Sequence, residues 1–123
     1  MKDPLRVFVV EDSSDLRFLY RLMLEQAGYE LVGEAGTSAA ALADAPDLEP
    51  DVVMIDVVLP DGRGFDLARL LRELLPEATI VLCSGAVPDV ARETAAAGAD
   101  GWLDKAEIRH LVPFLERLTA ERC

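Results

Sequence analysis

The stretch Asp51-Val52-Val53-Met54-Ile55-Asp56-Val57-Val58-Leu59-Pro60 decides the fold of this chain. Its apolar residues 52–55 lie between two aspartates, and a short apolar run with polar ends is typical of a strand buried on both faces. Asp56 stands where this strand leaves the sheet, at the kind of edge where open α/β sheets bind ligands. A lone aspartate there more often caps the next turn, so a function for Asp56 depends on which residues join it.

The composition is that of one folded domain, which we expect to span residues 1–123. The chain is 51% hydrophobic, enough to bury a core, and it has no apolar run near the ~20 residues of a membrane-spanning helix. Its N-terminal residues lack the apolar stretch of a signal peptide. We therefore expect a cytoplasmic protein. The net charge of −11 disfavours direct contact with nucleic acids and anionic membranes, and it favours metal cations.

Short apolar segments alternate along the chain with segments of helical periodicity. Strands are expected at 5–10, 30–35, 52–55, 79–83 and 99–103, and helices at 15–27, 38–45, 65–75, 88–97 and 106–121. This alternation predicts a doubly wound (βα)5 fold, with a five-stranded parallel sheet between two layers of helices. The second strand is the most polar and is assigned to an edge, which gives the strand order 2-1-3-4-5.

Several boundaries depend on single residues. Pro46 and Pro50 are expected to bracket the loop before the central strand, and Pro88 to open the fourth helix. Residues 60–64 are read as a plain loop. On the first helix, Leu19 and Tyr20 are placed together on the buried stripe.

Polar residues follow four of the expected strands: Glu11, Asp12, Asp56, Ser84 and Lys105. In a parallel sheet the carboxyl ends of all strands lie on one side, so these side chains can converge. Three carboxylates in one cleft repel one another and are costly to bury unpaired, and a hard cation such as Mg²⁺ removes that cost.

This set of groups is suited to phosphoryl transfer. The carboxylate of Asp56 can act as a nucleophile and become an acyl phosphate. A metal ion and the ammonium group of Lys105 can neutralise the charge that spreads over the phosphoryl oxygens. The hydroxyl of Ser84 can donate a hydrogen bond to the same oxygens.

Over essentially its full length the chain resembles the receiver domains of response regulators in two-component signalling. The matching residues are Glu11-Asp12, Asp56 with Pro60 and Gly64 four and eight positions later, Ser84 and Lys105. The resemblance implies a flavodoxin-like fold. It also implies a protein that catalyses only the phosphorylation and dephosphorylation of its own aspartate.

The resemblance assigns a role to each site residue. It implies that Asp56 accepts phosphate from a histidine kinase or a histidine phosphotransfer protein, and that Ser84 and Lys105 hold the phosphoryl group. It implies that Mg²⁺ is bound by Glu11, Asp12, Asp56 and the backbone carbonyl of Val58. The expected output is a changed contact with a downstream effector protein or with a second copy of the chain. The chain is expected to be a stand-alone receiver or one excised from a longer protein.

The sequence departs from the family pattern at two positions. Trp102 stands where the family usually has a Tyr or Phe that moves inward with Ser84 on activation; packing on the last helix is the alternative. Ala106 stands where a proline commonly follows Lys105. The cis peptide of that junction is not expected here, because a non-proline cis bond costs ~2.5–4 kcal/mol.

Three aromatic or aliphatic residues lie off the main helical stripes. Phe18 and Leu22 are either partly buried under long polar side chains or in contact with the helices of a kinase. Phe114, on the last helix, is assigned to a surface for effectors or for a second copy.

Two other functions compete with a phosphorylated switch. One is a receiver-like module that binds proteins without being phosphorylated, for which Trp102 and Ala106 leave room. The other is a small phosphatase with an aspartate nucleophile. That chemistry usually needs a second acid two residues after the nucleophile, where this chain has Val58.

Overall fold

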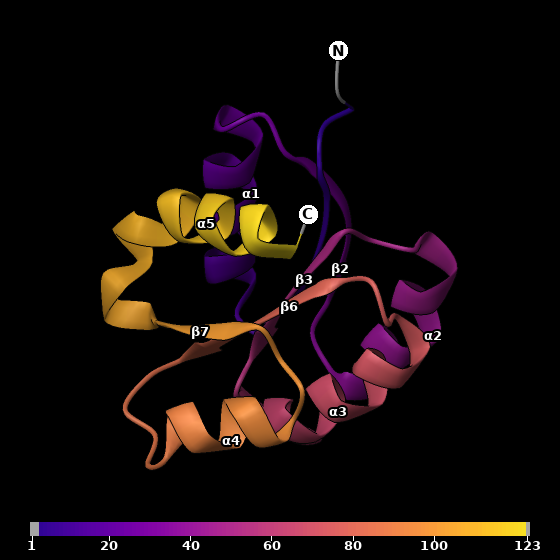
Figure 1. Ribbon diagram of the computed structural model, residues 1–123, viewed down its shortest axis with the longest axis vertical. Coiled ribbons are helices and arrows are strands. Elements are labelled where there is room, and N and C mark those ends of the chain that lie inside the picture. Colours follow the sequence, from indigo (N-terminus) through magenta and orange to yellow (C-terminus); the bar gives the residue numbers. More distant parts are fainter. Residues whose placement is uncertain (1–2, 123) are drawn as a thin grey trace.

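The structure, a computed structural model, describes residues 3–122, which form a parallel sheet with helices on both faces (Figure 1). The elements are β1 (Arg6–Val10), α1 (Ser14–Gln26), β2 (Glu30–Ala35), α2 (Ser38–Leu48), β3 (Val52–Asp56), β4 (Val58–Leu59), β5 (Gly62–Arg63), α3 (Gly64–Leu74), β6 (Thr79–Ser84), α4 (Val90–Ala96), β7 (Gly101–Asp104), the 3₁₀ helix η1 (Lys105–His110) and α5 (Leu111–Arg122). The strand order β2-β1-β3-β6-β7 is the predicted order 2-1-3-4-5, so the doubly wound, flavodoxin-like fold is confirmed.

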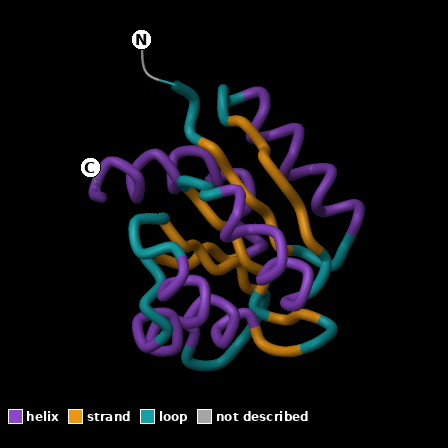
Figure 2. Tube along the Cα trace, turned by 90° about the vertical axis from the view of Figure 1, so that its right-hand side faces the viewer, coloured by secondary structure: helices purple, strands orange, loops and turns teal. Residues whose placement is uncertain are grey.

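The side chains of β3 alternate between two hydrophobic cores, as the two-residue period of a strand requires. Val53 and Ile55 pack against α2, α3 and α4, and Val52 and Met54 pack against α1 and α5. Figure 1 shows these two groups of helices on opposite sides of the sheet, and in Figure 2 the strands lie between helices. Burial on both faces explains why the decisive stretch is apolar without interruption.

Helix α2 is longer than predicted, because it passes through Pro46 and ends at Leu48. Proline removes one backbone hydrogen bond, and this loss falls in the last turn. Ala41 and Ala45 on the same helix are fully buried, and Leu48 packs against their core. We attribute the extra turn to this packing. The predicted start is confirmed, because the side chain of Thr37 caps the helix.

The last two helices begin later than predicted. Pro88 precedes α4 without opening it; Asp89 adopts a left-handed backbone, and the helix starts at Val90. The final segment opens as a 3₁₀ helix, and α5 starts only at Leu111. Pro113 explains that start, because proline is tolerated in the first turn of an α-helix but not in its interior.

Two local predictions were wrong. Leu19 is 40% exposed rather than part of the buried stripe of α1. Residues 60–64 are not a plain loop, because β4 and β5 pair there as a small antiparallel hairpin with Val58 opposite Arg63. The hairpin returns the chain to Gly64, whose N–H donates to the carbonyl of Val57 at 2.7 Å.

Candidate functional site

Three carboxylates meet at the carboxyl edge of β1 and β3. Glu11 and Asp56 are buried and Asp12 is exposed, and one oxygen of each lies within 4.8 Å of the others. The pairing of β3 with β6 places Asp56 at this edge, beside its register partner Cys83. The N–H of Val58 donates to Asp56 Oδ1 at 3.1 Å, which orients the carboxylate. No described contact tests the Val58 carbonyl as a metal ligand, so that role stays a prediction.

Lys105 follows the edge strand β7, and its side chain reaches two of these carboxylates. Its Nζ atom lies 3.0 Å from Glu11 Oε1 and 3.0 Å from Asp56 Oδ2. The turn that carries it is held by Asp104, whose side chain accepts from the N–H of Ala106 at 2.9 Å. An alanine after the lysine therefore still allows the ammonium group to enter the site.

Ser84 is fully buried at the end of β6, one residue after Cys83, the register partner of Asp56, and it is itself paired with Asp104 on β7. Its hydroxyl donates to the carbonyl of Gly85 at 2.8 Å. Ser84 therefore stands at the same edge as the carboxylates, with its hydrogen bond directed to its own loop.

The pKa values of Glu11 and Lys105 are shifted by burial and by their contacts within the site. Burial raises the pKa of Glu11, and the charge of Asp56 adds to this; Lys105 and the N–H of Ser13 only partly offset it. Burial by itself would lower the pKa of Lys105, but contact with Asp56 and Glu11 outweighs it and raises that pKa. The ammonium group is therefore charged at neutral pH.

The donor set fits a hard divalent cation. Within residues 3–122, the buried Glu11 Oε1 atom has no hydrogen-bond partner, because Lys105 approaches it at ion-pair distance but outside hydrogen-bond geometry. A buried carboxylate oxygen that has an ion pair but no hydrogen bond, beside two further carboxylates, is an arrangement that Mg²⁺ or a similar ion can satisfy.

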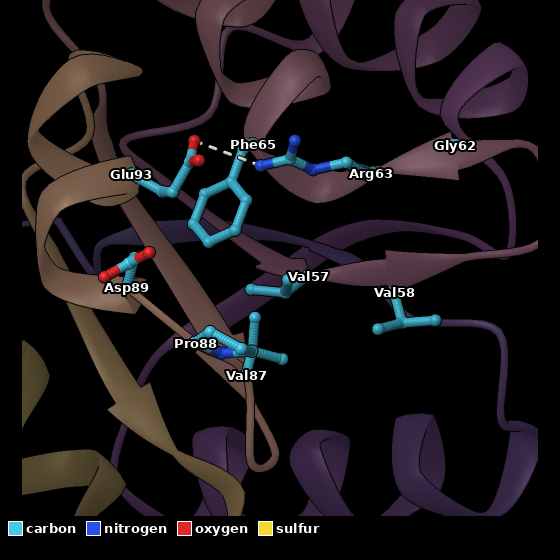
Figure 3. Close-up of a pocket in the computed structure, with 9 residues that line it drawn as sticks. All are labelled: Val57, Val58, Gly62, Arg63, Phe65, Val87, Pro88, Asp89 and Glu93. Carbon is cyan, nitrogen blue, oxygen red and sulfur yellow. Dashed lines mark ion pairs between the residues drawn. The ribbon is translucent and has the colours of Figure 1, made fainter.

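A cavity of about 400 Å³ opens beside the residues that directly follow Asp56 (Figure 3). Val57 and Val58 form one side and Val87 another. Above them Arg63 is paired with Glu93 at 3.0 Å, and its guanidinium lies 5.1 Å from the centre of the Phe65 ring. The cavity lies between the β4–β5 hairpin and the start of α4, and its lining combines apolar side chains with the charged Arg63, Asp89 and Glu93.

Trp102, predicted to move with Ser84, and Phe114, predicted to lie on a partner surface, both have contacts within the chain. Trp102 on β7 faces Leu82 on β6 and is 37% exposed, so it is only partly covered. Phe114 is partly buried over β7, where a Cβ added at Gly101 would lie 3.2 Å from its ring. Contacts inside the chain thus occupy part of the surface that Phe114 was expected to offer.

Two contacts around the site were missed in the sequence. Arg17 donates to the carbonyl oxygen of Glu11 at 2.6 Å. The carboxylate of Asp61, at the tip of the hairpin, accepts from the N–H groups of Ser38 and Ala39 at 2.8 and 3.0 Å and so caps α2. Neither residue belongs to a motif. The contact of Arg17 is with a residue six positions earlier, whereas that of Asp61 joins segments 23 positions apart.

Comparison with known proteins agrees with this geometry. A family model for the response regulator receiver domain matches residues 7–115. The chain is 33% identical over 79 residues to the chemotaxis protein CheY of Thermotoga maritima, covering 64% of this chain and 66% of that protein. It is 34% identical over 114 residues to the transcriptional regulatory protein PdtaR of Mycobacterium tuberculosis, covering 92% of this chain and 56% of that protein. The chain thus spans less than two thirds of these relatives.

Solved structures give the same result. A CheY-like receiver domain protein from Methanospirillum hungatei superposes with a TM-score of 0.88 at 25% identity, covering 97% of this chain and 96% of that one. Within residues 3–122, no helix is both long and apolar enough to span a membrane. The family match, the fold and the acidic edge of the sheet agree, and the chain belongs to the response-regulator receiver family of two-component signalling.

Proposed function

We propose that the chain is a single receiver domain in which Asp56 is the phosphoacceptor. The observation that carries this proposal is the position of the Lys105 ammonium group, which lies 3.0 Å from a carboxylate oxygen of Asp56 and 3.0 Å from one of Glu11. A charged lysine beside a buried aspartate at the edge of a parallel sheet provides a nucleophile and a cation at one point. Asp12 and Ser84, at the same edge of the sheet, then complete the proposed site.

In the proposed reaction an oxygen of Asp56 forms a bond to phosphorus while the bond from phosphorus to the donor breaks. For a phosphohistidine donor the leaving group is the imidazole nitrogen of a kinase or phosphotransfer protein. The N–H of Val58 holds Oδ1, and Lys105 neutralises charge on the transferring group. Ser84 would exchange its bond to Gly85 for one to a phosphoryl oxygen.

The acidic cluster is the proposed Mg²⁺ site. Glu11, Asp12 and Asp56 would hold the ion, together with the Val58 carbonyl. When bound, Mg²⁺ supplies positive charge for the phosphoryl oxygens in the transition state. The chain itself is a signalling module, and the only chemistry that we assign to it is the phosphorylation and dephosphorylation of Asp56. Phosphorylation adds roughly two negative charges, and the output is a changed contact with an effector protein or a second copy.

Labelling by a small acyl-phosphate donor tests this function directly. In the presence of Mg²⁺ we expect intact mass spectrometry to show one added phosphoryl group, because the chain itself supplies the side chains that the proposed reaction needs. Asp56→Asn should abolish the label, and removal of Mg²⁺ with a chelator should strongly reduce it. A folded protein that never takes the label would support a phosphorylation-independent module. A label that survives in Asp56→Asn would place the acceptor elsewhere.

Phe18 is the residue whose replacement should separate the kinase from small donors. It is 55% exposed on α1, next to the exposed Leu19 and Leu22, and α1 begins directly after the acidic pair. We expect Phe18→Asp to slow transfer from a kinase at least ~10-fold, because replacing an aromatic residue that is buried in an interface often costs that much binding. Labelling by a small donor should be unchanged.

The matched control is Leu70→Asp. Leu70 is also apolar and 48% exposed, but it lies on α3 on the opposite face of the sheet. It should leave both reactions unchanged. If Phe18→Asp reduced both kinds of labelling equally, the docking role would be wrong, because the defect would then lie in the site.

The acyl phosphate should be lost slowly. Val58, which is 67% exposed, and Ala86 flank the acceptor, and neither side chain can orient or deprotonate a water molecule. We expect the label to outlast gel filtration in Mg²⁺ buffer, and Val58→Asn to shorten its lifetime by adding a hydrogen-bonding group. Loss of the label from the wild-type protein within the time of that step would contradict this.

A further inference from the structure

The guanidinium group of Arg17 joins the backbone of the acidic pair to a neighbouring strand. Its Nη1 atom donates to the carbonyl oxygen of Glu11 at 2.6 Å, and its Nε atom lies 3.4 Å from Glu34 Oε1 on β2. Both side chains are largely buried, at 25% and 20% exposure. Glu34 thus fixes the guanidinium group of Arg17, and that group in turn holds the carbonyl of Glu11.

The carbonyl that Arg17 binds belongs to the peptide group between Glu11 and Asp12. The N–H of Glu11, which belongs to the preceding peptide group, is fixed to β2 by a 2.9 Å bond to the carbonyl of Ala35. A Cβ added at Gly36 would lie 3.4 Å from Arg17 Nη1 and 3.9 Å from the Cα of Asp12, so guanidinium, bare backbone and acidic pair pack closely. These contacts leave the peptide little freedom to rotate.

The side chain of Asp12 depends on this peptide more than that of Glu11 does. The carboxylate of Glu11 is buried and accepts from the N–H of Ser13 at 3.1 Å, so it has contacts of its own. Asp12 is exposed. The part of Asp12 that the fold fixes is therefore its backbone, from which the carboxylate extends.

We propose that Arg17, held by Glu34, is a positioning residue that orients the peptide between Glu11 and Asp12 and thereby sets the affinity of the acidic cluster for Mg²⁺. This rests on the proposed metal site. It assigns to Arg17 the part that outer partners of metal ligands usually have, namely to fix the ligands before the ion arrives.

Electrostatics alone predicts the opposite sign. Arg17 carries a positive charge near a cation site, so removing that charge should tighten Mg²⁺ binding. If Arg17 positions the ligands, its removal should weaken binding. The direction of the change therefore distinguishes the two effects.

Arg21 provides the matched control. It lies one turn further along α1 and pairs with the other carboxylate oxygen of the same Glu34, and its described ion pair does not involve Glu11. Arg21→Gln and Arg17→Gln remove the same charge from the same helix and the same partner. Only Arg17→Gln removes the bond to the Glu11 carbonyl.

The experiment measures Mg²⁺ affinity without phosphorylation, from the rise of the unfolding temperature with Mg²⁺ concentration relative to the metal-free protein. We expect Arg17→Gln to raise the Kd for Mg²⁺ roughly 10-fold, the lower end for outer partners of metal ligands. Arg21→Gln should leave the Kd unchanged or lower it. Arg17→Lys keeps the charge but not the two-pronged geometry, so its Kd should lie between wild type and Arg17→Gln.

Each result decides one of the two proposals. Equal Kd values for Arg17→Gln and Arg21→Gln, or tighter binding by Arg17→Gln, would overturn the positioning role. If the wild type shows no Mg²⁺-dependent shift, or if Asp12→Asn leaves that shift intact, the proposed metal site fails instead. Should Arg17→Gln not fold, Arg17→Lys and Glu34→Gln carry the test, and wild-type affinity in both would refute the proposal.

Discussion

Gly64→Ala should lower the free energy of unfolding by about 3 kcal/mol or more, a large part of the ~5–15 kcal/mol that stabilises a domain. A Cβ at this position would lie 2.1 Å from the carbonyl oxygen of Asp56 and 2.9 Å from the Cα of Val57. Both are backbone atoms of the central strand and its exit, so no side-chain rotation can relieve the overlap. Urea denaturation measures the loss.

The control for this substitution is Gly85→Ala. Gly85 lies at the same edge of the sheet, and a Cβ there would meet nothing within 4 Å. Its effect should stay within about 0.5 kcal/mol. If Gly64→Ala were as stable as Gly85→Ala, the close approach of Gly64 to Asp56 would not exist in solution. Any folded fraction of Gly64→Ala should also be labelled more slowly, because the added methyl group displaces Asp56, the proposed acceptor.

Arg72→Met should have the second largest effect, a loss of about 2–4 kcal/mol. The guanidinium of Arg72 donates to the carbonyls of Gly98 and Ala78 at 2.9 and 2.8 Å, and it pairs with Asp100 at 2.7 Å. Removing one partner of a buried ion pair costs about 3–5 kcal/mol, which we reduce because Arg72 and Asp100 are about one-fifth exposed. Thermal or urea unfolding measures this loss.

Arg69→Met is the matched control for Arg72. Arg69 lies three residues earlier on α3, is half exposed and pairs only with the exposed Asp66 in the described structure. Exposed pairs of this kind contribute about 0.3–0.5 kcal/mol. Equal losses for the two variants would show that the contacts of Arg72 to the loops contribute nothing beyond an ordinary surface charge.

The strands were predictable because their signal is local. The apolar run before Asp56 is typical of a strand with both faces covered, and β3 is buried at every position. The polar pattern of residues 30–35 likewise identified an edge strand, which β2 is. Once the strands are parallel, their carboxyl ends share an edge. That rule brings Lys105 to Asp56 although they are 49 positions apart in the sequence.

Helix boundaries and exposure were less predictable, because they depend on packing partners. Pro46 reads as a helix end, yet α2 continues past it while its apolar side chains are buried. Leu19 reads as part of a buried stripe, yet the stripe that α1 uses is narrower and leaves Leu19 exposed. In both cases a local preference worth a few kcal/mol at most competes with contacts to another layer.

The amino-acid order alone was sufficient for the fold class, the strand order and the set of acidic, hydroxyl and amino groups at one edge. Only the folded chain shows that Arg17 donates a hydrogen bond to the carbonyl of Glu11 and that Arg72 donates hydrogen bonds to two loops. It also shows that Asp61 caps α2. Hydrophobic periodicity is a property of neighbouring residues, so it can be read along the chain. A long polar side chain can reach partners on any segment nearby, and which segments lie nearby is decided by the packing of the layers.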